Sequence, residues 1–199
     1  MTGQLPPSAS VALPMGDIKL HAPAADRNRS ALCDLLRAHA PQQGRALEIA
    51  IGTGQHIAAF GAAMPELQWQ PTEPQSARRA SIDAYVREAG LRNVAPAIPL
   101  DATATGWHAS VPPQDLIFLA NLLHLLPAPS VQRLIVEAAL ALAPGGTLIL
   151  YGPFSRAGRL TSDGDIKFDG ELRAADPAIG YKDTVDIATW LSDGGISPI

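Results

Sequence analysis

The chain has 199 residues, of which 47% are hydrophobic and 17% charged, and its formal net charge is −4. A chain of this length can bury a full core in one domain, and this composition excludes disorder across the whole chain. The negative charge and the lack of a Lys/Arg cluster argue against a nucleic-acid partner, because such partners are bound by basic patches or stripes.

Cys33 is the single cysteine of the sequence. An internal disulfide and a Cys-based metal site are therefore excluded, and the apolar surroundings of Cys33 predict a buried thiol. The histidines are scattered over separate elements, so we predict no metal site. No apolar run approaches the roughly 18 residues that span a bilayer, and the N-terminus lacks the basic and apolar regions of a secretory signal. We therefore expect a cytoplasmic protein without a membrane partner.

Residues 1–25 are rich in Pro, Ala and Ser, which predicts a flexible N-terminal arm or a lid that orders on ligand binding. Residues 26–199 are predicted to form the ligand-binding domain. In this domain, helical and strand-like apolar patterns alternate. The predicted helices are 30–39, 55–64, 76–89 and 131–142, and the predicted strands are 45–50, 67–71, 94–100, 115–120 and 147–151. This alternation predicts an α/β fold with a mostly parallel sheet and helices on both of its faces.

A glycine turn follows the first predicted strand of the domain. Gly52 and Gly54 stand where a tight turn would let the backbone approach a ligand closely and adopt a positive φ. Glu48 lies within the strand itself, and a buried carboxylate is unfavourable unless it is paired or hydrogen-bonded. It is either a core acid that forms a salt bridge with Arg27 or Arg29, or an acceptor that faces the ammonium group of a cationic ligand.

A second acid, Glu73, ends the next predicted strand, about 20 residues beyond the turn. An acid at this spacing can hydrogen-bond the two ribose hydroxyls of a nucleoside, although a solvated loop acid is an open alternative. Ile57 stands where a dinucleotide-binding motif has its third glycine. The pattern therefore favours an adenosine ligand without a pyrophosphate, S-adenosylmethionine (SAM) rather than NAD.

Six short motifs in order make the sequence similar to a known family. They are Arg27-Asn28-Arg29, the stretch from Leu47 to His56, Trp69-Gln70-Pro71, Asn121-Leu122-Leu123-His124, Tyr151-Gly152-Pro153-Phe154, and Phe168-Asp169 followed by Leu172-Arg173. Over residues 22–190 the chain resembles the class I SAM-dependent methyltransferase-like family that includes methyltransferase-like protein 26. The resemblance implies a Rossmann-like class I methyltransferase fold and assigns no substrate.

The resemblance also implies a set of cofactor-binding residues. Gly52 and Gly54 would face the methionine part of SAM, and Glu73 would hold its ribose. Asp101 would reach the adenine amino group, and Asn121 would lie under the sulfonium. Arg27 and Asn28 would open the first helix and close over the cofactor carboxylate, because a helix N-terminus favours an anion.

The sequence departs from this family in three places. Ile51 stands where relatives have a small residue, and residues 162–165 lack a Ser-Asn pair. Relatives also continue into two strands beyond the last helix, so we expect a sheet that lacks the two C-terminal strands. Strand 147–151 would then be an unpaired edge, and such edges pair with other chains. We therefore expect a homodimer, or another chain that covers this edge.

Methyl transfer from a sulfonium depends largely on holding donor and acceptor close together. A base is needed only if the acceptor carries a proton. His124 and Tyr151 are the predicted catalytic residues, although His124 could be only a packed side chain and Tyr151 could only hydrogen-bond across the sheet. The sequence thus predicts a SAM-dependent methyltransferase acting on a small molecule. The alternative is a SAM-binding protein without that activity, working as a partner subunit or repurposed for another reaction.

Overall fold

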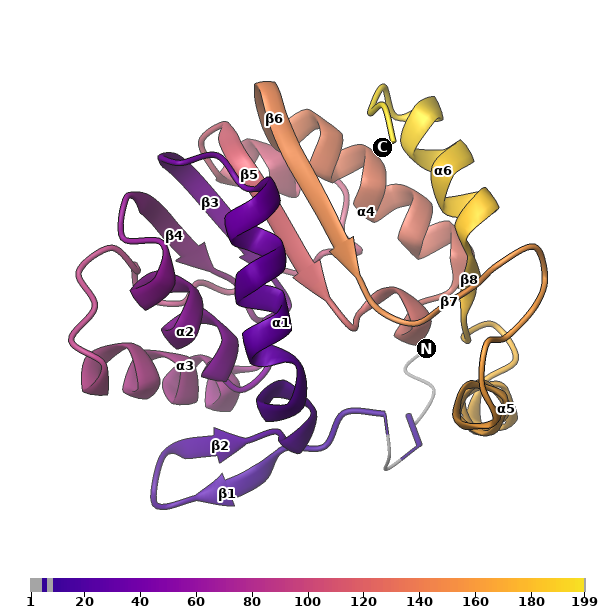
Figure 1. Cartoon of the computed structure of the whole chain (residues 1–199), viewed down its shortest axis with the longest axis horizontal. Coiled ribbons are helices and arrows are strands. Elements are labelled where there is room, and N and C mark those ends of the chain that lie inside the picture. Colours follow the sequence, from indigo (N-terminus) through magenta and orange to yellow (C-terminus); the bar gives the residue numbers. More distant parts are fainter. Residues whose placement is uncertain (1–4, 7–8, 199) are drawn as a thin grey trace.

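A computed structural model describes residues 5–6 and 9–198 (Figure 1). Its central sheet has four parallel strands in the order β4-β3-β5-β6. Their bounds are Gly44–Ile49 for β3, Leu67–Pro71 for β4, Gln114–Ala120 for β5 and Leu142–Tyr151 for β6. The predicted α/β fold with a parallel sheet is confirmed.

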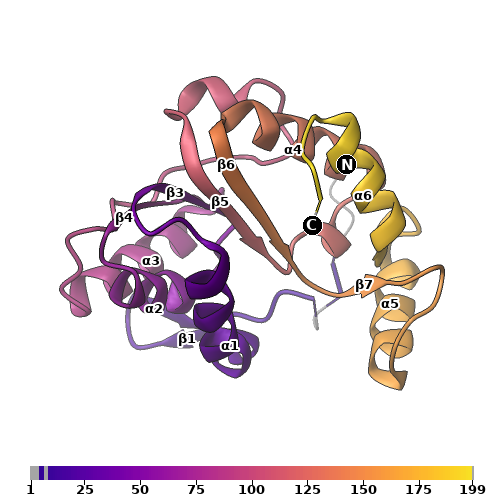
Figure 2. The ribbon, with the colours of Figure 1, turned by 45° about the horizontal axis from the view of Figure 1, so that its top comes forward.

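Helices cover both faces of the sheet, as the two views show (Figures 1 and 2). One layer contains α1 (Pro23–His39), α2 (Gln55–Ala63) and α3 (Ser76–Glu88), and the other contains α4 (Ala128–Ala141) and α6 (Thr184–Asp193). Successive strand residues point to opposite faces, so Ala46 belongs to one core cluster and its neighbour Leu47 to the other. Burial on both faces explains why β5 is apolar at every position from Leu116 to Ala120.

The N-terminal region is more structured than the sequence predicts. Within the predicted arm 1–25, β1 (Leu13–Met15) and β2 (Lys19–His21) form an antiparallel hairpin. Helix α1 begins at Pro23, seven residues before the predicted start, because proline is well suited to a first helical turn that needs no N–H. The predicted domain boundary therefore falls inside α1. Residues 1–4 and 7–8 of the predicted arm lie outside the described residues.

The predicted strand 94–100 is wrong as a regular strand. It makes two isolated parallel bridges, Trp69↔Val94 and Thr72↔Ile98. The ladder between them is interrupted because Pro71 has no N–H to donate, and because the N–H of Ala97 is bonded by the Asp83 carboxylate at 2.8 Å. The segment still runs beside β4 and brings the chain to the carboxyl edge of the sheet.

The last part of the chain lies beyond β6. It contains a two-stranded parallel pair, β7 (Phe154–Ser155) with β8 (Lys182–Asp183), and helix α5 (Asp163–Ala175). Two short 3₁₀ helices, η1 (Trp107–Ser110) and η2 (Leu123–Leu125), precede and follow β5. Within the described residues, β6 pairs only with β5. No helix in this described part is long and apolar enough to cross a membrane.

Candidate cofactor site at the carboxyl ends of the strands

In the turn after β3, every second residue has a left-handed backbone conformation. Ala50, Gly52 and Gly54 have φ values of 52°, 75° and 104°. At Gly54 a Cβ atom would lie 2.7 Å from the Cα atom of Ile82, so this position requires glycine for space as well as for φ. Ala50 is strained, since an alanine with positive φ is uncommon. Sequence reasoning found the two glycines and missed Ala50, whose small size was the only signal.

Glu73 joins the turn to the end of β4. Its side chain is buried, and its two oxygens accept the N–H groups of Gly52 and Gln75, each at 3.1 Å. The alternative of a solvated loop acid is therefore wrong. The predicted contact with a ribose is not tested by this arrangement and stays a prediction, but the carboxylate lies at the predicted turn.

Glu48 lies in β3 with its side chain 1% exposed, and its Oε2 atom has no hydrogen-bond partner among the described residues. Burial raises the pKa of this carboxyl well above its ordinary value. The predicted salt bridge is not formed among the described residues: Arg29 pairs with Asp26 at 3.4 Å, and Arg27 forms no ion pair with Glu48. The strand that leads into the glycine turn therefore contains a buried acid, and one oxygen of this acid has no hydrogen-bond partner among the described residues.

Asn121 and Tyr151 meet where β5 and β6 end. The N–H of Asn121 donates to the carbonyl oxygen of Tyr151 at 2.8 Å. Asn121 has a φ of 56°, a conformation that asparagine tolerates better than most residues. A Cβ atom on Gly152 would lie 3.7 Å from the Cα atom of Asn121, so the two strand ends approach closely. This edge therefore contains a second left-handed residue that is not glycine.

The start of α1 is bound to the turn by side chains. Gln55, the first residue of α2, accepts the N–H of Ala22 at 2.6 Å and donates to Asp26 at 2.7 Å. Asn28 contacts His56 at 2.8 Å between Oδ1 and Nε2, and burial lowers the pKa of His56 to about 4. Gln55 was missed in the sequence because its partners lie about 30 residues away.

The expectation that Arg27 and Asn28 open the first helix is wrong. They lie in the second turn of α1, because the helix begins at Pro23. Their side chains therefore cannot act through the N-terminal end of this helix, and any contact with a cofactor carboxylate would have to be direct.

Two other predicted residues have local partners. Asp101 is exposed, and its Oδ1 atom accepts the N–H and the hydroxyl of Thr103 at 2.9 and 2.7 Å. His124 is buried in η2, with its ring 5.5 Å from that of Phe168 and 6.1 Å from that of Tyr181. Burial lowers the pKa of His124 to about 4. Within the described residues neither side chain is hydrogen-bonded to the glycine turn, so their predicted roles stay predictions.

The arrangement suits a ligand with several hydrogen-bonding groups. The glycine turn leads into α2, whose first N–H groups have no side-chain cap. The Glu73 carboxylate stands beside it as an acceptor. Among the residues that the structure describes, no group of three or more His, Cys, Asp or Glu side chains could hold a metal ion.

Comparisons with known proteins agree with this architecture. A family model described as "Protein of unknown function (DUF938)" matches residues 19–196. An O-methyltransferase family protein from Burkholderia thailandensis superposes with a TM-score of 0.73 at 19% identity, over 86% of this chain and 52% of that one. CalO1, a methyltransferase in calicheamicin biosynthesis, solved in an S-adenosylhomocysteine (SAH)-bound form, gives 0.67 at 15% identity, over 86% and 49%.

PigF, solved with SAH, gives a TM-score of 0.73 at 14% identity, over 86% of this chain and 50% of that one. The chain thus spans about half the length of these three proteins. At these identities the likeness establishes the fold, which is the Rossmann-like fold of methyltransferases.

Proposed function

The chain belongs to the DUF938 family of proteins of unknown function, and from that premise we propose that it is a SAM-dependent methyltransferase acting on a small molecule. One observation carries the proposal: a left-handed glycine turn at the end of β3 is bonded to a buried acid at the end of β4. Ligands in such folds bind at the carboxyl ends of the strands. The two SAH-bound proteins of the same fold support the choice of cofactor.

The residues of the turn fit this cofactor. Gly52 and Gly54 would lie against its methionine part, Glu73 would bind its ribose, and Asp101 would bind its adenine. A ligand ammonium near Glu48 would favour the charged form of that carboxyl, which burial alone disfavours. A bound cation would therefore provide the partner that the Oε2 atom of Glu48 lacks.

The chemistry at the strand ends is simple. SAM supplies an activated methyl group on its sulfonium, and Asn121 would lie beneath that group. The task of the protein is then to hold the acceptor in line and to exclude water. Burial lowers the pKa of His124 to about 4, so its ring is neutral at pH 7 and would accept a proton from an acceptor only as a weak base; Tyr151 is the other candidate.

One observation favours a second function. His124 packs among aromatic rings of the α5 and β8 region, which suits a structural histidine. We therefore keep as the alternative a SAM-binding protein without methyltransferase activity. The two functions differ in one measurement, the formation of SAH from SAM when candidate small-molecule acceptors are added.

The assembly is also a proposal. We propose a homodimer in which a second copy covers the outer edge of β6. The side chains of Leu148 and Leu150 line an apolar groove of about 340 Å³ between β6 and α6, and an open strand edge can pair with another chain. Sedimentation as a monomer at micromolar concentration would contradict it. We also propose that the protein is cytoplasmic and that it belongs to the group that includes methyltransferase-like protein 26.

The test of the cofactor is calorimetric titration of the purified protein with SAM, SAH and NAD. We expect micromolar binding of SAM and SAH and none of NAD. Glu73→Ala should weaken SAH binding about tenfold or more, the loss expected for a buried charged hydrogen bond. Glu66→Ala, an exposed acid before β4, is the matched control and should bind as the wild type does.

Two outcomes of this titration would contradict the proposal. If the folded wild type binds neither SAM nor SAH, the cofactor proposal fails and a partner-binding role replaces it. If Glu73→Ala keeps full affinity while its melting temperature shows that it is folded, the ribose is bound elsewhere.

A further inference from the structure

The N-terminal segment crosses the carboxyl edge of the sheet. In Figures 1 and 2 the indigo segment before β1 runs past the arrowheads of β5 and β6 toward α5. We call residues 9–12, which precede β1, the strap. Ser10 lies on the α3 side, where its hydroxyl and carbonyl oxygens accept from Nη2 of Arg78 at 2.7 and 3.5 Å. Ala9 packs against the cluster of Leu172, Ile179 and Tyr181 beyond β6.

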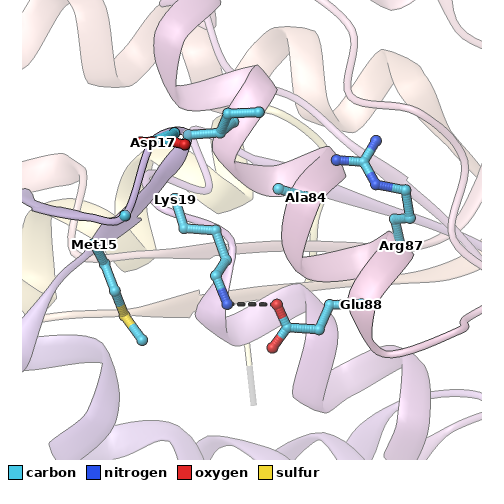
Figure 3. Close-up of a pocket in the computed structure, with 8 residues that line it drawn as sticks. Met15, Asp17, Lys19, Ala84, Arg87 and Glu88 are labelled. Carbon is cyan, nitrogen blue, oxygen red and sulfur yellow. Dashed lines mark hydrogen bonds and ion pairs between the residues drawn. The ribbon is translucent and has the colours of Figure 1, made fainter.

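The base of the strap is fixed on α3. The N–H of Leu20, in β2, donates to the Ser81 hydroxyl at 2.8 Å, and the Tyr85 hydroxyl donates to the Leu20 carbonyl at 3.2 Å. Lys19 pairs with Glu88 at 2.5 Å beside the cavity under the hairpin (Figure 3). The inner strand of the hairpin is therefore anchored by three contacts to one helix.

The strap itself is held loosely. Its large apolar side chain, Val11, is 43% exposed, and Leu13 and Met15 in the following strand β1 are 50% and 48% exposed. A segment with few buried apolar contacts opens at low free energy. Because β2 is anchored and the strap is not, we expect the hairpin to act as the hinge. This hinge consists of the turn, residues 16–18, and the β1–β2 ladder.

The contact between Arg78 and Ser10, which we call the latch, lies beside the glycine turn. A Cβ atom on Gly52 would point toward Nη1 of Arg78, at 3.8 Å. The same guanidinium holds Ser10 through its other nitrogen, so Arg78 links the strap to the turn that is bonded to Glu73. A ligand held by that turn would lie on the inner side of the strap.

We propose that the strap is a gate over the cofactor site, latched by the Arg78–Ser10 pair. It opens about the β1–β2 hairpin to let the cofactor enter, and it closes to slow the cofactor's escape. This proposal rests on the proposed function for the identity of the ligand, but the latch itself is a property of the ligand-free chain.

Two measurements test it on the full chain. In hydrogen exchange, Ser10→Ala and Arg78→Ala should each speed exchange about fivefold at the Ala9 amide, whose N–H donates to the Pro6 carbonyl oxygen at 2.9 Å, and SAH should slow exchange at this amide in the wild type. In stopped-flow kinetics, SAH should dissociate about fivefold faster from either variant. The double variant should be no faster than the single ones, since both substitutions remove the same bond.

Arg87→Ala is the matched control, because Arg87 is on the same helix and lines the cavity of Figure 3 without touching Ser10. It should leave both rates unchanged. Unchanged SAH dissociation from Ser10→Ala, with normal binding by the wild type, would overturn the gate and leave the proposed function standing. Failure of the wild type to bind SAH would overturn the proposed function, and the exchange rates alone would then decide whether the latch exists.

Discussion

Two buried glutamates on opposite sides of the sheet show opposite solutions to the same physical problem. Glu137, in α4, accepts the N–H groups of Gly106 and His108 at 2.7 and 3.2 Å and contacts His108 Nδ1 at 2.8 Å. Burial alone would raise the pKa of Glu137, but these bonds outweigh it and hold the pKa below its ordinary value. Glu48, in β3, has an unpartnered oxygen and a raised pKa.

The difference separates a structural acid from a candidate ligand-binding acid. Glu137 fastens the loop before β5 to α4 and leaves nothing for a ligand to satisfy. Glu48 lies just before a turn that contains backbone strain at Ala50, and a second strained residue, Asn121, follows the neighbouring strand β5 at the same edge of the sheet. Strain and unmet hydrogen-bonding capacity in one place are typical of functional sites.

The largest effect is expected from Gly54→Ala. The new Cβ atom would lie 2.7 Å from the Ile82 Cα atom at a φ of 104°, so overpacking and backbone strain together should lower the free energy of unfolding by about 3–5 kcal/mol. Gly90→Ala is the control, because its φ of 64° is also positive but nothing lies within 4 Å. Urea denaturation measures both. Equal losses would mean that the turn is not closely packed.

Glu137→Ala should follow. It leaves the three donors from Gly106 and His108 without their acceptor, which should lower the free energy of unfolding by about 3 kcal/mol. Because the loop is remote from the glycine turn, SAH affinity at a temperature where the variant is folded should not change. A loss of SAH affinity in Glu137→Ala would mean that the loop before β5 and the glycine turn are coupled, and that Glu137 is not a purely structural acid.

The sequence predicted the sheet well where hydrophobic pattern alone decides. Residues 67–71 form a strand with the predicted bounds, because their burial alternates along β4. The pattern failed at residues 94–100, where prolines and the Asp83 carboxylate take part of the ladder. It also predicted the start of the first helix seven residues too late, because Pro23 and the residues after it lack a clear apolar period.

Within the site, the sequence predicted residues whose type is unusual for their place. Glu48 stood out in an apolar strand and Glu73 stood out by spacing. Gln55 and Ala50 could not be found, because their roles depend on contacts with a distant helix and on a backbone angle. Neither is visible in residue type. The predicted role of Asp101 stays a prediction.

The buried histidines should make stability depend on pH. Burial lowers the pKa of His56 and of His124 from 6.5 to about 4. The unfolded chain therefore binds more protons between pH 6.5 and 4, so stability is full above pH 6.5 and falls as the pH is lowered. At pH 5 each histidine should cost about 2 kcal/mol relative to pH 7.

His124→Phe isolates one of these two effects. It should reduce the loss between pH 7 and pH 5 by about 2 kcal/mol in urea denaturation, because phenylalanine has no proton to gain. His39→Phe, at an exposed position near the end of α1, should leave the loss as it is in the wild type. The same loss in His124→Phe as in the wild type would mean that His124 is charged in the native protein.

The smallest effect should be the most informative, because its sign differs between the two glutamates. A carboxyl whose pKa is raised in the folded protein loses stability as the pH rises above its unfolded pKa. Glu48→Gln removes that loss, so it should stabilise the ligand-free protein at pH 7 by about 1 kcal/mol. The same change at Glu137 should destabilise it.

In calorimetry Glu48→Gln should also weaken SAH binding, since a neutral amide attracts a ligand ammonium less than a carboxylate does. If Glu48→Gln destabilises the chain or leaves SAH affinity unchanged, Glu48 is a structural acid like Glu137, and the distinction between the two regions fails.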